Sequence, residues 1–436
     1  MHWISQLLFI LCLGTGIYFF WKSVSRIRRN ILLGKDLDLT DRPKERLKQL
    51  IWVALGQSKM VTRPVAAFFH IIIYVGFVLI NIEVLEILID GIFGTHRFFS
   101  HFLGDVYNTA IAFFELLALG VIIACVVFLS RRYILKLKRL NMPELKGWPI
   151  KDATIILYVE IVLMLALLCM NASDQILQGR GILEKHGSFP VSYWLTGFFE
   201  AFSTQYLVVA ERTFWWFHII GILIFLNYVP YSKHWHIIMS FPNVYYSNLK
   251  SKGEFTNNTA ITTEVNLMMN PSYQVEENYV PPTSFGAKDV TDLTWKNLMD
   301  AYSCTECGRC TSVCPANITG KILSPRKIMM DTRDRLEEVG KSIDLAKKTG
   351  ENTSDGKSLH SYISPEELWA CTTCNACAEA CPININPVDI IFQMRQYLVM
   401  EQSAAPTELN NMFTNMENNG APWQFNPNDK ANWTMD

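Results

Sequence analysis

The chain has 436 residues, of which 50% are hydrophobic, and its formal net charge is −1. This near-neutral balance argues against a nucleic-acid-binding protein, and the length allows two or three domains. Long apolar runs occur only before residue 240, whereas the rest of the chain is polar and rich in Asn, Pro and Lys. We therefore expect a membrane part over residues 1–240, followed by a soluble part.

Five segments of the membrane part are apolar and long enough to cross a bilayer, which requires about 20 residues. They are residues 3–21, 65–89, 107–129, 153–172 and 213–230. The first has its positive charges after the apolar stretch, which favours a reverse-oriented anchor over a signal peptide. Residues 191–210 are also apolar, but Glu200 and Gln205 interrupt them. We expect an interfacial or packed extracellular helix there.

The basic residues of the loops predict the orientation of the spans. Loops 22–64 and 130–152 contain eleven and seven Lys or Arg, whereas the alternate loops contain four in total. Because basic loops stay on the cytoplasmic side, the N-terminus is predicted to lie outside and the soluble part in the cytoplasm. We expect a multi-pass protein of the inner membrane, in contact with lipid.

Three histidines are candidates for binding a cofactor in or near the spans. His218 and His236 are 18 residues apart. In a helix that continues past Pro230 they would share one face, about 27 Å apart. His70 lies early in the second span, at a depth similar to that of His236. Two neutral imidazoles that face each other across a bundle form a bis-histidine haem site. The alternative is that His234 and His236 only contact lipid headgroups or backbone carbonyls.

Four carboxylates also fall within the spans, where a charged group is costly and commonly functional. They are Glu83, Glu86, Glu115 and Glu160. Glu115, in the middle of the third span, is the sharper candidate for a quinone or proton site, because quinol oxidation releases protons. For Glu83 and Glu86, a structural bond to a neighbouring helix explains the residue equally well.

The soluble part contains eight of the eleven cysteines, in the runs CTECGRCTSVCP (304–315) and CTTCNACAEACP (371–382). Both have the form C-x2-C-x2-C-x3-C-P, which is the bacterial [4Fe–4S] run, and its fourth cysteine ligates the other cluster. Zinc sites built from two CxxC pairs do not explain this spacing. The predicted ligands are Cys304, Cys307, Cys310 and Cys381 for cluster 1, and Cys371, Cys374, Cys377 and Cys314 for cluster 2.

The segment between the runs, SPRKIMMDTRDRLEEVGKSIDLAKK, has helical periodicity, and a compact βαββαβ ferredoxin has no room for it. We therefore predict an all-α fold, in which a five-helix transmembrane bundle (1–240) precedes a cytoplasmic helical di-[4Fe–4S] ferredoxin domain (295–400). Residues 241–294 are expected to form an extended, solvent-facing linker. Residues 401–436 are expected to form a tail that either docks a partner or is flexible.

The membrane part resembles a known cytochrome. Its five-span layout, outside N-terminus and segment VPYSKHWHIIMSFP resemble the gamma subunit of respiratory nitrate reductase, a membrane cytochrome b that oxidises quinol. His218 and His236 match the haem-ligating histidines of that family's fifth span, and His70 matches the first of two in its second span. The position of the other is occupied by Ile80 or Asn81. The resemblance thus implies one haem b held by His70 and His236, with His218 at a haem or quinone site.

The soluble part resembles a second family. The segments LSPRKIMMDTR and LWACTTCNACAEACPININPVDIIFQMRQYLV are similar to the helical ferredoxin family, which includes the C subunit of heterodisulfide reductase and related iron–sulfur reductases. Residues 417–433 are similar to the segment that leads, in larger membrane reductases, into a cysteine-rich catalytic domain. No cysteine follows Cys381, so the resemblance implies a separate cytoplasmic cysteine-rich catalytic partner.

Together these features predict a non-catalytic electron-transfer subunit of a membrane redox complex. It would pass electrons between the quinone pool, one haem b, two [4Fe–4S] clusters and the soluble partner. The alternative is a haem-free membrane anchor, or an iron–sulfur sensor or docking protein. The histidines discriminate between the two, since an anchor has no need for His70 and His236 at matched depth.

Overall fold

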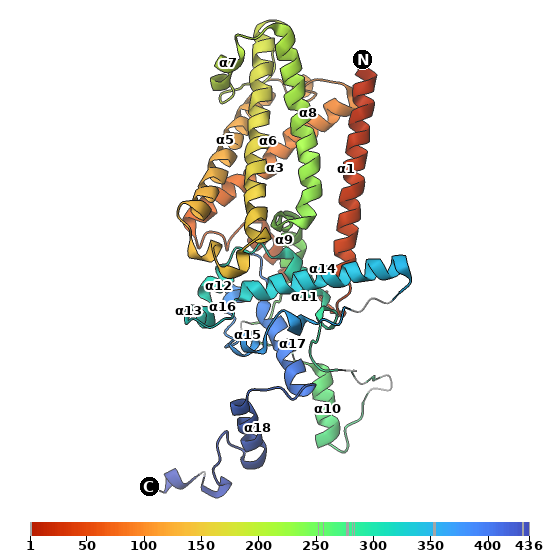
Figure 1. The fold of residues 1–436 in the computed structure, drawn as a ribbon. Coiled ribbons are helices and arrows are strands. Elements are labelled where there is room, and N and C mark those ends of the chain that lie inside the picture. Colours follow the sequence, from red (N-terminus) through yellow and green to blue (C-terminus); the bar gives the residue numbers. More distant parts are fainter. Residues whose placement is uncertain are drawn as a thin grey trace.

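The computed structural model describes residues 2–251, 253–255, 257–275, 279–280, 282, 284–351, 355–429 and 431–435. Over these residues the regular structure is helical, apart from an isolated β-bridge between Lys35 and Thr294. Figure 1 shows a bundle of long helices and, at one end of it, a group of shorter helices that leads to the C-terminus. The predicted all-α class is confirmed.

In the part of the chain that the structure describes, five helices are long and apolar enough to cross a membrane, so the chain is a multi-pass membrane protein. Within the bundle α6 packs against α5 and α8, α3 packs against α5, and α1 packs against α8 and α3. Each helix is longer than its predicted apolar stretch, because it continues into polar residues beyond the apolar core. The five are α1 (His2–Ile31), α3 (Pro64–Phe93), α5 (Asp105–Tyr133), α6 (Trp148–Gly179) and α8 (Thr204–Tyr228).

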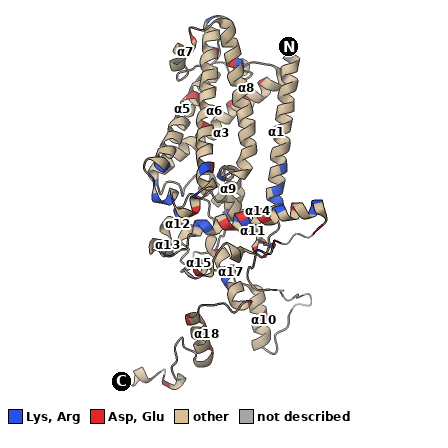
Figure 2. Ribbon diagram, viewed as in Figure 1, with Lys and Arg blue, Asp and Glu red and all other residues tan. Residues whose placement is uncertain are grey.

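Charged residues are sparse along the long helices and gather where the bundle meets the shorter helices (Figure 2). We call this end of the bundle, where α1, α5 and α8 end and α3 and α6 begin, the cysteine side, and the opposite end the far side. Short elements connect the long helices at both ends. They are α2 (Pro43–Gln49), a π-helical turn (Leu50–Leu55), α4 (Ser100–Leu103), 3-10 turns at Lys138–Leu140 and Pro143–Leu145, and α7 (Tyr193–Phe199).

The fifth span ends too early to carry His218 and His236 on one continuous helix. α8 stops at Tyr228, and two 3-10 turns, Val229–Tyr231 and Lys233–Trp235, precede α9 (His236–Tyr245). Pro230 has no N–H to continue the helical bonding. Ser232 is extended, and its side chain accepts a bond from the backbone N–H of His234, which starts the next turn. The continuous helix that the sequence-based placement required is therefore absent.

The far side is held by a buried polar network that the sequence did not indicate. The Arg97 guanidinium donates to Asp174 at 2.7 Å, to Asn171 at 3.0 Å and to Tyr107 at 3.1 Å. The Tyr107 hydroxyl donates in turn to Glu86 at 2.8 Å. These bonds join α3, the loop after it, α5 and α6. They favour the structural interpretation of Glu86, in which the carboxylate bonds a neighbouring helix, over a functional one.

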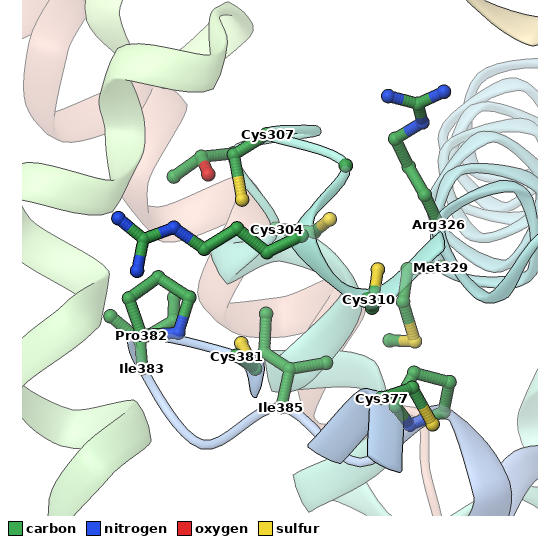
Figure 3. A pocket seen from close by; sticks show the side chains of 14 residues that line it. Cys304, Cys307, Cys310, Arg326, Met329, Cys377, Cys381, Pro382, Ile383 and Ile385 are labelled. Carbon is green, nitrogen blue, oxygen red and sulfur yellow. The ribbon is translucent and has the colours of Figure 1, made fainter. Parts of the chain in front are cut away.

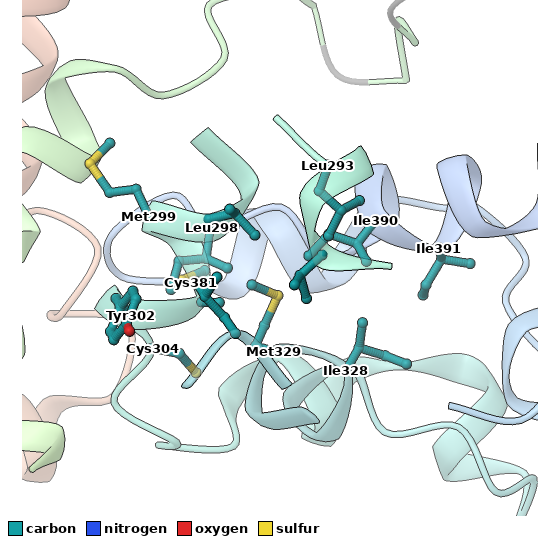
Figure 4. Close-up of a cluster of buried hydrophobic side chains, with 14 of the residues drawn as sticks. Leu293, Leu298, Met299, Tyr302, Cys304, Ile328, Met329, Cys381, Ile390 and Ile391 are labelled. Atoms are coloured by element: carbon teal, nitrogen blue, oxygen red, sulfur yellow. The ribbon is translucent and has the colours of Figure 1, made fainter. Parts of the chain in front are cut away.

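The soluble part packs around the long helix α14 (Pro325–Thr349), as predicted between the cysteine runs. Its hydrophobic core (Figure 4) continues into the bundle through Ile27 and Ile31 of α1 and Trp235 after α8. The core of the soluble part therefore extends to the cysteine side of the bundle, whereas the rest of the bundle has a separate core around Phe9, Ile111 and Leu167. The other helices here are α11 (Trp295–Ser303), α12 (Arg309–Val313), α13 (Pro315–Ile318), α15 (Pro365–Trp369), α16 (Ala376–Ala380) and α17 (Pro387–Met400), with 3-10 turns at Val290–Asp292 and Leu359–Ser361.

The linker and the tail contain helices that were not predicted. Within residues 241–294, α9 extends to Tyr245, and α10 (Thr259–Met269) begins after Asn258, whose side chain accepts from two backbone N–H groups of its first turn. The segment is therefore partly helical and not extended throughout. The tail contains α18 (Thr407–Asn419) and 3-10 turns at Pro427–Asp429 and Asn432–Thr434.

Candidate iron–sulfur and haem sites

The two cysteine runs have the same local backbone conformation. Glu306 and Gly308 in the first run have φ of 54° and 70°, and the equivalent Thr373 and Asn375 in the second have 54° and 57°. Such left-handed residues turn successive N–H groups toward one side of the loop and create an anion-binding concavity. Each loop is followed by a short helix, and these two helices, α12 and α16, pack against each other. The repeat seen in the sequence is thus a repeat of structure.

Only glycine fits at position 308. A Cβ atom there would collide with Nη1 of Arg326 and would lie 2.9 Å from the carbonyl oxygen of Arg139. The positive φ of 70° adds strain for any other residue. Gly308 therefore lets the first cysteine loop approach the loop between α5 and α6.

The cysteines form two groups, each drawn from both runs. Cys304, Cys307 and Cys310 line one pocket together with Cys381 of the second run (Figure 3). Cys314 of the first run lies instead near Cys371 and Cys377, which are also near Cys374. Cys377 also forms part of the wall of the first pocket. The structure thus brings together the four cysteines of each predicted ligand set.

The chemistry of these groups suits iron–sulfur clusters. Burial raises the pKa of Cys304 and Cys381 to about 12. Because thiols must lose their protons to bind metal, positive iron ions would stabilise the thiolates that burial alone disfavours. A set of thiolates without oxygen or imidazole ligands is typical of zinc or iron–sulfur sites, and the run spacing selects the latter.

The first cysteine loop contacts the segment that follows the fifth span. The Glu306 carboxylate accepts hydrogen bonds from Nζ of Lys233 at 2.6 Å and from Arg333 at 2.9 Å. Burial would raise the pKa of Glu306, but these two cations hold it below its ordinary value. Burial also lowers the pKa of Lys233, whose charge therefore depends on Glu306. We call this ion-paired trio the Glu306 junction.

Residues of the two basic loops of the bundle, 22–64 and 130–152, also bond to the first cysteine run and the helix that follows its loop. Arg139 donates to the carbonyl oxygen of Cys307 at 2.6 Å, and Arg309 donates to that of Lys59 at 2.9 Å. Arg63 donates to the Ser312 hydroxyl at 2.8 Å. Some of the basic residues that predicted the orientation therefore also attach the soluble part to the bundle.

His70 of α3 and His236 at the start of α9 face each other on the cysteine side. Their ring centroids are 6.4 Å apart, with the planes inclined by 39°. Two imidazoles on one iron, with Fe–N bonds of about 2.0 Å, would have centroids about 6.3 Å apart. Nδ1 of His236 donates to the carbonyl oxygen of Lys233 at 2.9 Å. This bond fixes the tautomer whose Nε2 carries the free lone pair, so the pair fits a bis-histidine ligand set.

A third histidine lies beside this pair. The His234 ring is 5.7 Å from that of His236, between centroids. Burial, with the neighbouring His236 and His70, lowers the pKa of His234 to about 3, so its imidazole is neutral. Its Nε2 is buried without a hydrogen-bond partner in the described part of the chain, and it lies 3.9 Å from a carboxylate oxygen of Glu160 on α6.

The remaining candidates from the sequence, His218 and Glu115, lie in packed surroundings. His218 is 1% exposed, and its Nδ1 bonds the carbonyl oxygen of Leu163 at 2.9 Å. Glu115 accepts bonds from Asn171 at 3.1 Å and from the backbone and side chain of Ser192. The bonds of Glu115 tie the segment before α7 to α5 and α6, which favours a structural role.

Comparison with known proteins supports the iron–sulfur assignment. Residues 303–385 match the 4Fe-4S dicluster domain, so this part of the chain holds two [4Fe–4S] clusters. The chain is 29% identical, over 98% of its length, to the probable iron-sulfur-binding oxidoreductase FadF of Bacillus subtilis. It is 26% identical, over 99%, to the EtfAB:quinone oxidoreductase of Syntrophomonas wolfei. It spans only 60% and 59% of these relatives' lengths.

The cysteine part has a separate likeness. Over 25% of this chain and 52% of the relative, it is 32% identical to the C subunit of the ferredoxin/F(420)H(2)-dependent CoB-CoM heterodisulfide reductase of Methanosarcina acetivorans. The predicted similarity to that subunit is thus confirmed, whereas none of these relatives is a nitrate reductase gamma subunit. No solved structure matches. The chain thus combines five helices able to cross a membrane with a segment, residues 303–385, that matches the 4Fe-4S dicluster domain.

Proposed function

We propose that this chain is the electron-transfer subunit of a quinone-linked membrane redox complex. Electrons pass between quinone in the membrane, one haem b and two [4Fe–4S] clusters, and then to or from a soluble partner. The observation that carries this proposal is the Glu306 junction. Lys233 donates a hydrogen bond to Glu306, which lies inside the first cysteine loop. Lys233 also lies three residues before His236 in the sequence. A candidate haem ligand and a cluster-binding loop therefore meet in one small region.

The proposed haem ligands are His70 and His236. Their centroid separation of 6.4 Å and the bond from His236 to the Lys233 carbonyl support this assignment. A bis-histidine haem supplies a one-electron couple with no open coordination position. The chain itself orients the ligands: α3 carries His70, and the turn at Lys233 fixes the ring of His236. Ring contacts between described residues join His236 to His70 and His234 but not to His218, so one haem is proposed.

The proposed cluster ligands are the two groups of cysteines described above. The pocket lined by Cys304, Cys307, Cys310 and Cys381 would hold the first cluster, and its loop is the one attached to the bundle. Cys371, Cys374, Cys377 and Cys314 would hold the second. Because Cys374 is exposed, the second cluster is the better placed of the two to exchange electrons with a soluble protein.

The quinone and the partner are proposed from the relatives. One is named for its quinone oxidoreductase activity and another belongs to a heterodisulfide reductase. The partner would be a cytoplasmic, cysteine-rich iron–sulfur catalytic protein. Trp423 and Trp433 of the tail are 58% and 78% exposed, and exposed tryptophans are favoured at protein interfaces. The cysteine side of the bundle would be cytoplasmic, because the basic loops 22–64 and 130–152 lie there. A reporter fused after Met239 should therefore read cytoplasmic, and one near His96 the opposite.

The test is to purify the full chain and measure its cofactors. We expect about eight non-haem iron and eight acid-labile sulfide per chain, and about one haem b by the pyridine haemochrome method. The haem should then either be reduced by quinol or, once reduced, be reoxidised by quinone. Full clusters without haem would refute the electron path through His70 and His236 and support the haem-free anchor. Haem that exchanges electrons with neither quinol nor quinone would refute the link to quinone.

A further inference from the structure

His234 and Glu160 form an incomplete polar pair inside the bundle. The 3.9 Å between Nε2 of His234 and the nearest oxygen of Glu160 is too long for a hydrogen bond. It is short enough that one hydroxyl or carbonyl oxygen, about 2.8 Å from each atom, would reach both. The two side chains are 11% and 15% exposed, but Nε2 of His234 itself is buried, so a ligand would reach it by displacing part of its surroundings. A buried ring nitrogen without a partner is costly, and an oxygen-bearing ligand would satisfy it.

Aromatic rings surround the imidazole of this pair. The ring centroid of Phe225 on α8 lies 5.4 Å from that of His234, and the centroid of Phe77 on α3 lies 6.4 Å away. Phe77 is itself 42% exposed on the outside of the bundle. A planar ring entering from the lipid would therefore pass Phe77 and lie among flat apolar groups. Few polar groups within an aromatic lining are typical of small-molecule sites.

We propose that His234 and Glu160 bind the head group of the quinone, with both side chains hydrogen-bonding the same ring oxygen. The inference rests on the proposed quinone-linked function and adds the place of the site. Quinol would donate its hydroxyl hydrogen to one member of the pair and accept a hydrogen bond from the other. The site lies directly beside the proposed haem, because the rings of His234 and His236 are in contact.

The other buried polar groups in the spans are less suited to this role. The bonds of Glu115 are already made within the protein. The bond from Nδ1 of His218 leaves its Nε2 free, as in His236, but no ring contact between described residues joins His218 to the His70–His236 pair. Glu83 has a carboxylate oxygen with no hydrogen-bond partner among the described residues, but it lies 13 residues after His70 on α3, which is about 20 Å along the helix. Among these groups, the pair at His234 is the one that combines an unsatisfied polar atom, aromatic walls and contact with the His70–His236 site.

The test uses the full chain in detergent and the fluorescent quinol analogue 2-heptyl-4-hydroxyquinoline N-oxide, whose emission is quenched on binding. We expect Glu160→Gln and His234→Gln to weaken binding at least tenfold. Haem and iron content should be unchanged. Glu83→Gln is the matched control for a buried carboxylate, and His218→Gln for a buried imidazole. Both controls should bind as the wild type does.

The outcomes separate this inference from the function on which it rests. Normal binding by both test variants, or loss of binding only in His218→Gln, would overturn the site while leaving a quinone-linked subunit. Failure of wild type both to bind the analogue and to exchange electrons with quinol or quinone would overturn the function as well. If the variants fold poorly, photolabelling of wild type with an azidoquinone decides: label on α6 and at 233–235 supports the site, and label elsewhere refutes it.

Discussion

Replacing Glu306 by glutamine is expected to weaken the attachment of the first cysteine loop to the bundle. The carboxylate is 3% exposed and lies 2.6 Å from Lys233 and 2.9 Å from Arg333. Removing one charge from a buried pair costs about 3–5 kcal/mol, because the other charge is left uncompensated. Here Arg333 keeps Asp334 at 3.3 Å and Lys233 keeps the Pro149 carbonyl at 2.7 Å. We therefore expect a smaller loss of about 2–3 kcal/mol.

The loss should appear as earlier bleaching of the iron–sulfur absorbance when the purified protein is titrated with urea. With a urea dependence of about 2 kcal/mol per molar, the midpoint should fall by about 1 M or slightly more. Glu366→Gln, at an exposed position in α15, is the matched control and should change stability by less than about 0.5 kcal/mol. Equal midpoints for the two variants would refute the reasoning.

The same carboxylate predicts how the attachment depends on pH. Lys233 and Arg333 lower the pKa of Glu306 from its ordinary value of 4.5. A lowered pKa in the folded state means that the contribution is complete above pH 4.5 and is lost as the pH falls through the lowered value. The difference in urea midpoint between wild type and Glu306→Gln should therefore be constant above pH 4.5 and shrink below it. A difference that grows on acidification would contradict this sign.

Three other predictions test the remaining sites. His70→Ala should abolish the pyridine haemochrome band, whereas His218→Ala should leave it; the reverse result would withdraw the one-haem assignment. Cys314→Ser should damage the cluster held mainly by the second cysteine run. The measurement would show a loss of about four irons and of one of two EPR signals. Loss of the first cluster alone would show that Cys314 does not ligate the cluster of the other run. Gly308→Ala should lower the free energy of unfolding by about 1–3 kcal/mol, because its Cβ would collide with Arg326. The iron–sulfur absorbance should therefore be lost at a lower temperature. An unchanged temperature would mean that the loop can move to accommodate the methyl group.

The parts of the fold that could be predicted are those whose physics is local in sequence. A span is a run of apolar residues, and an iron–sulfur loop is a fixed spacing of thiols, so both can be recognised without the tertiary structure. The helix α14 was likewise predicted from its periodicity. The similar depth of His70 and His236 could also be inferred from the sequence, but the facing of their rings depends on the turn after α8, which the sequence did not reveal.

The parts that could not be predicted depend on partners that are distant in the chain. Glu115 was singled out because a carboxylate in mid-span is costly, but its donors, Asn171 and Ser192, lie 56 and 77 residues away. Nothing in the pattern shows that these groups converge on it. The pairing of Lys233 with Glu306, 73 residues away, is hidden for the same reason. A charged residue within a cysteine run looks like a solvated loop residue until its partners are known.

The interruption after α8 has the largest consequence among these non-local features. Pro230 ends the helical bonding, and Ser232, with φ of −114° and ψ of 162°, is an extended residue that redirects the chain. Within the next four residues, Lys233 pairs with the cysteine loop, His234 lies next to Glu160, and His236 faces His70. One short turn therefore sets the positions of the junction, the proposed quinone site and a proposed haem ligand. A change that straightened this turn would displace all three together, so their geometries are coupled.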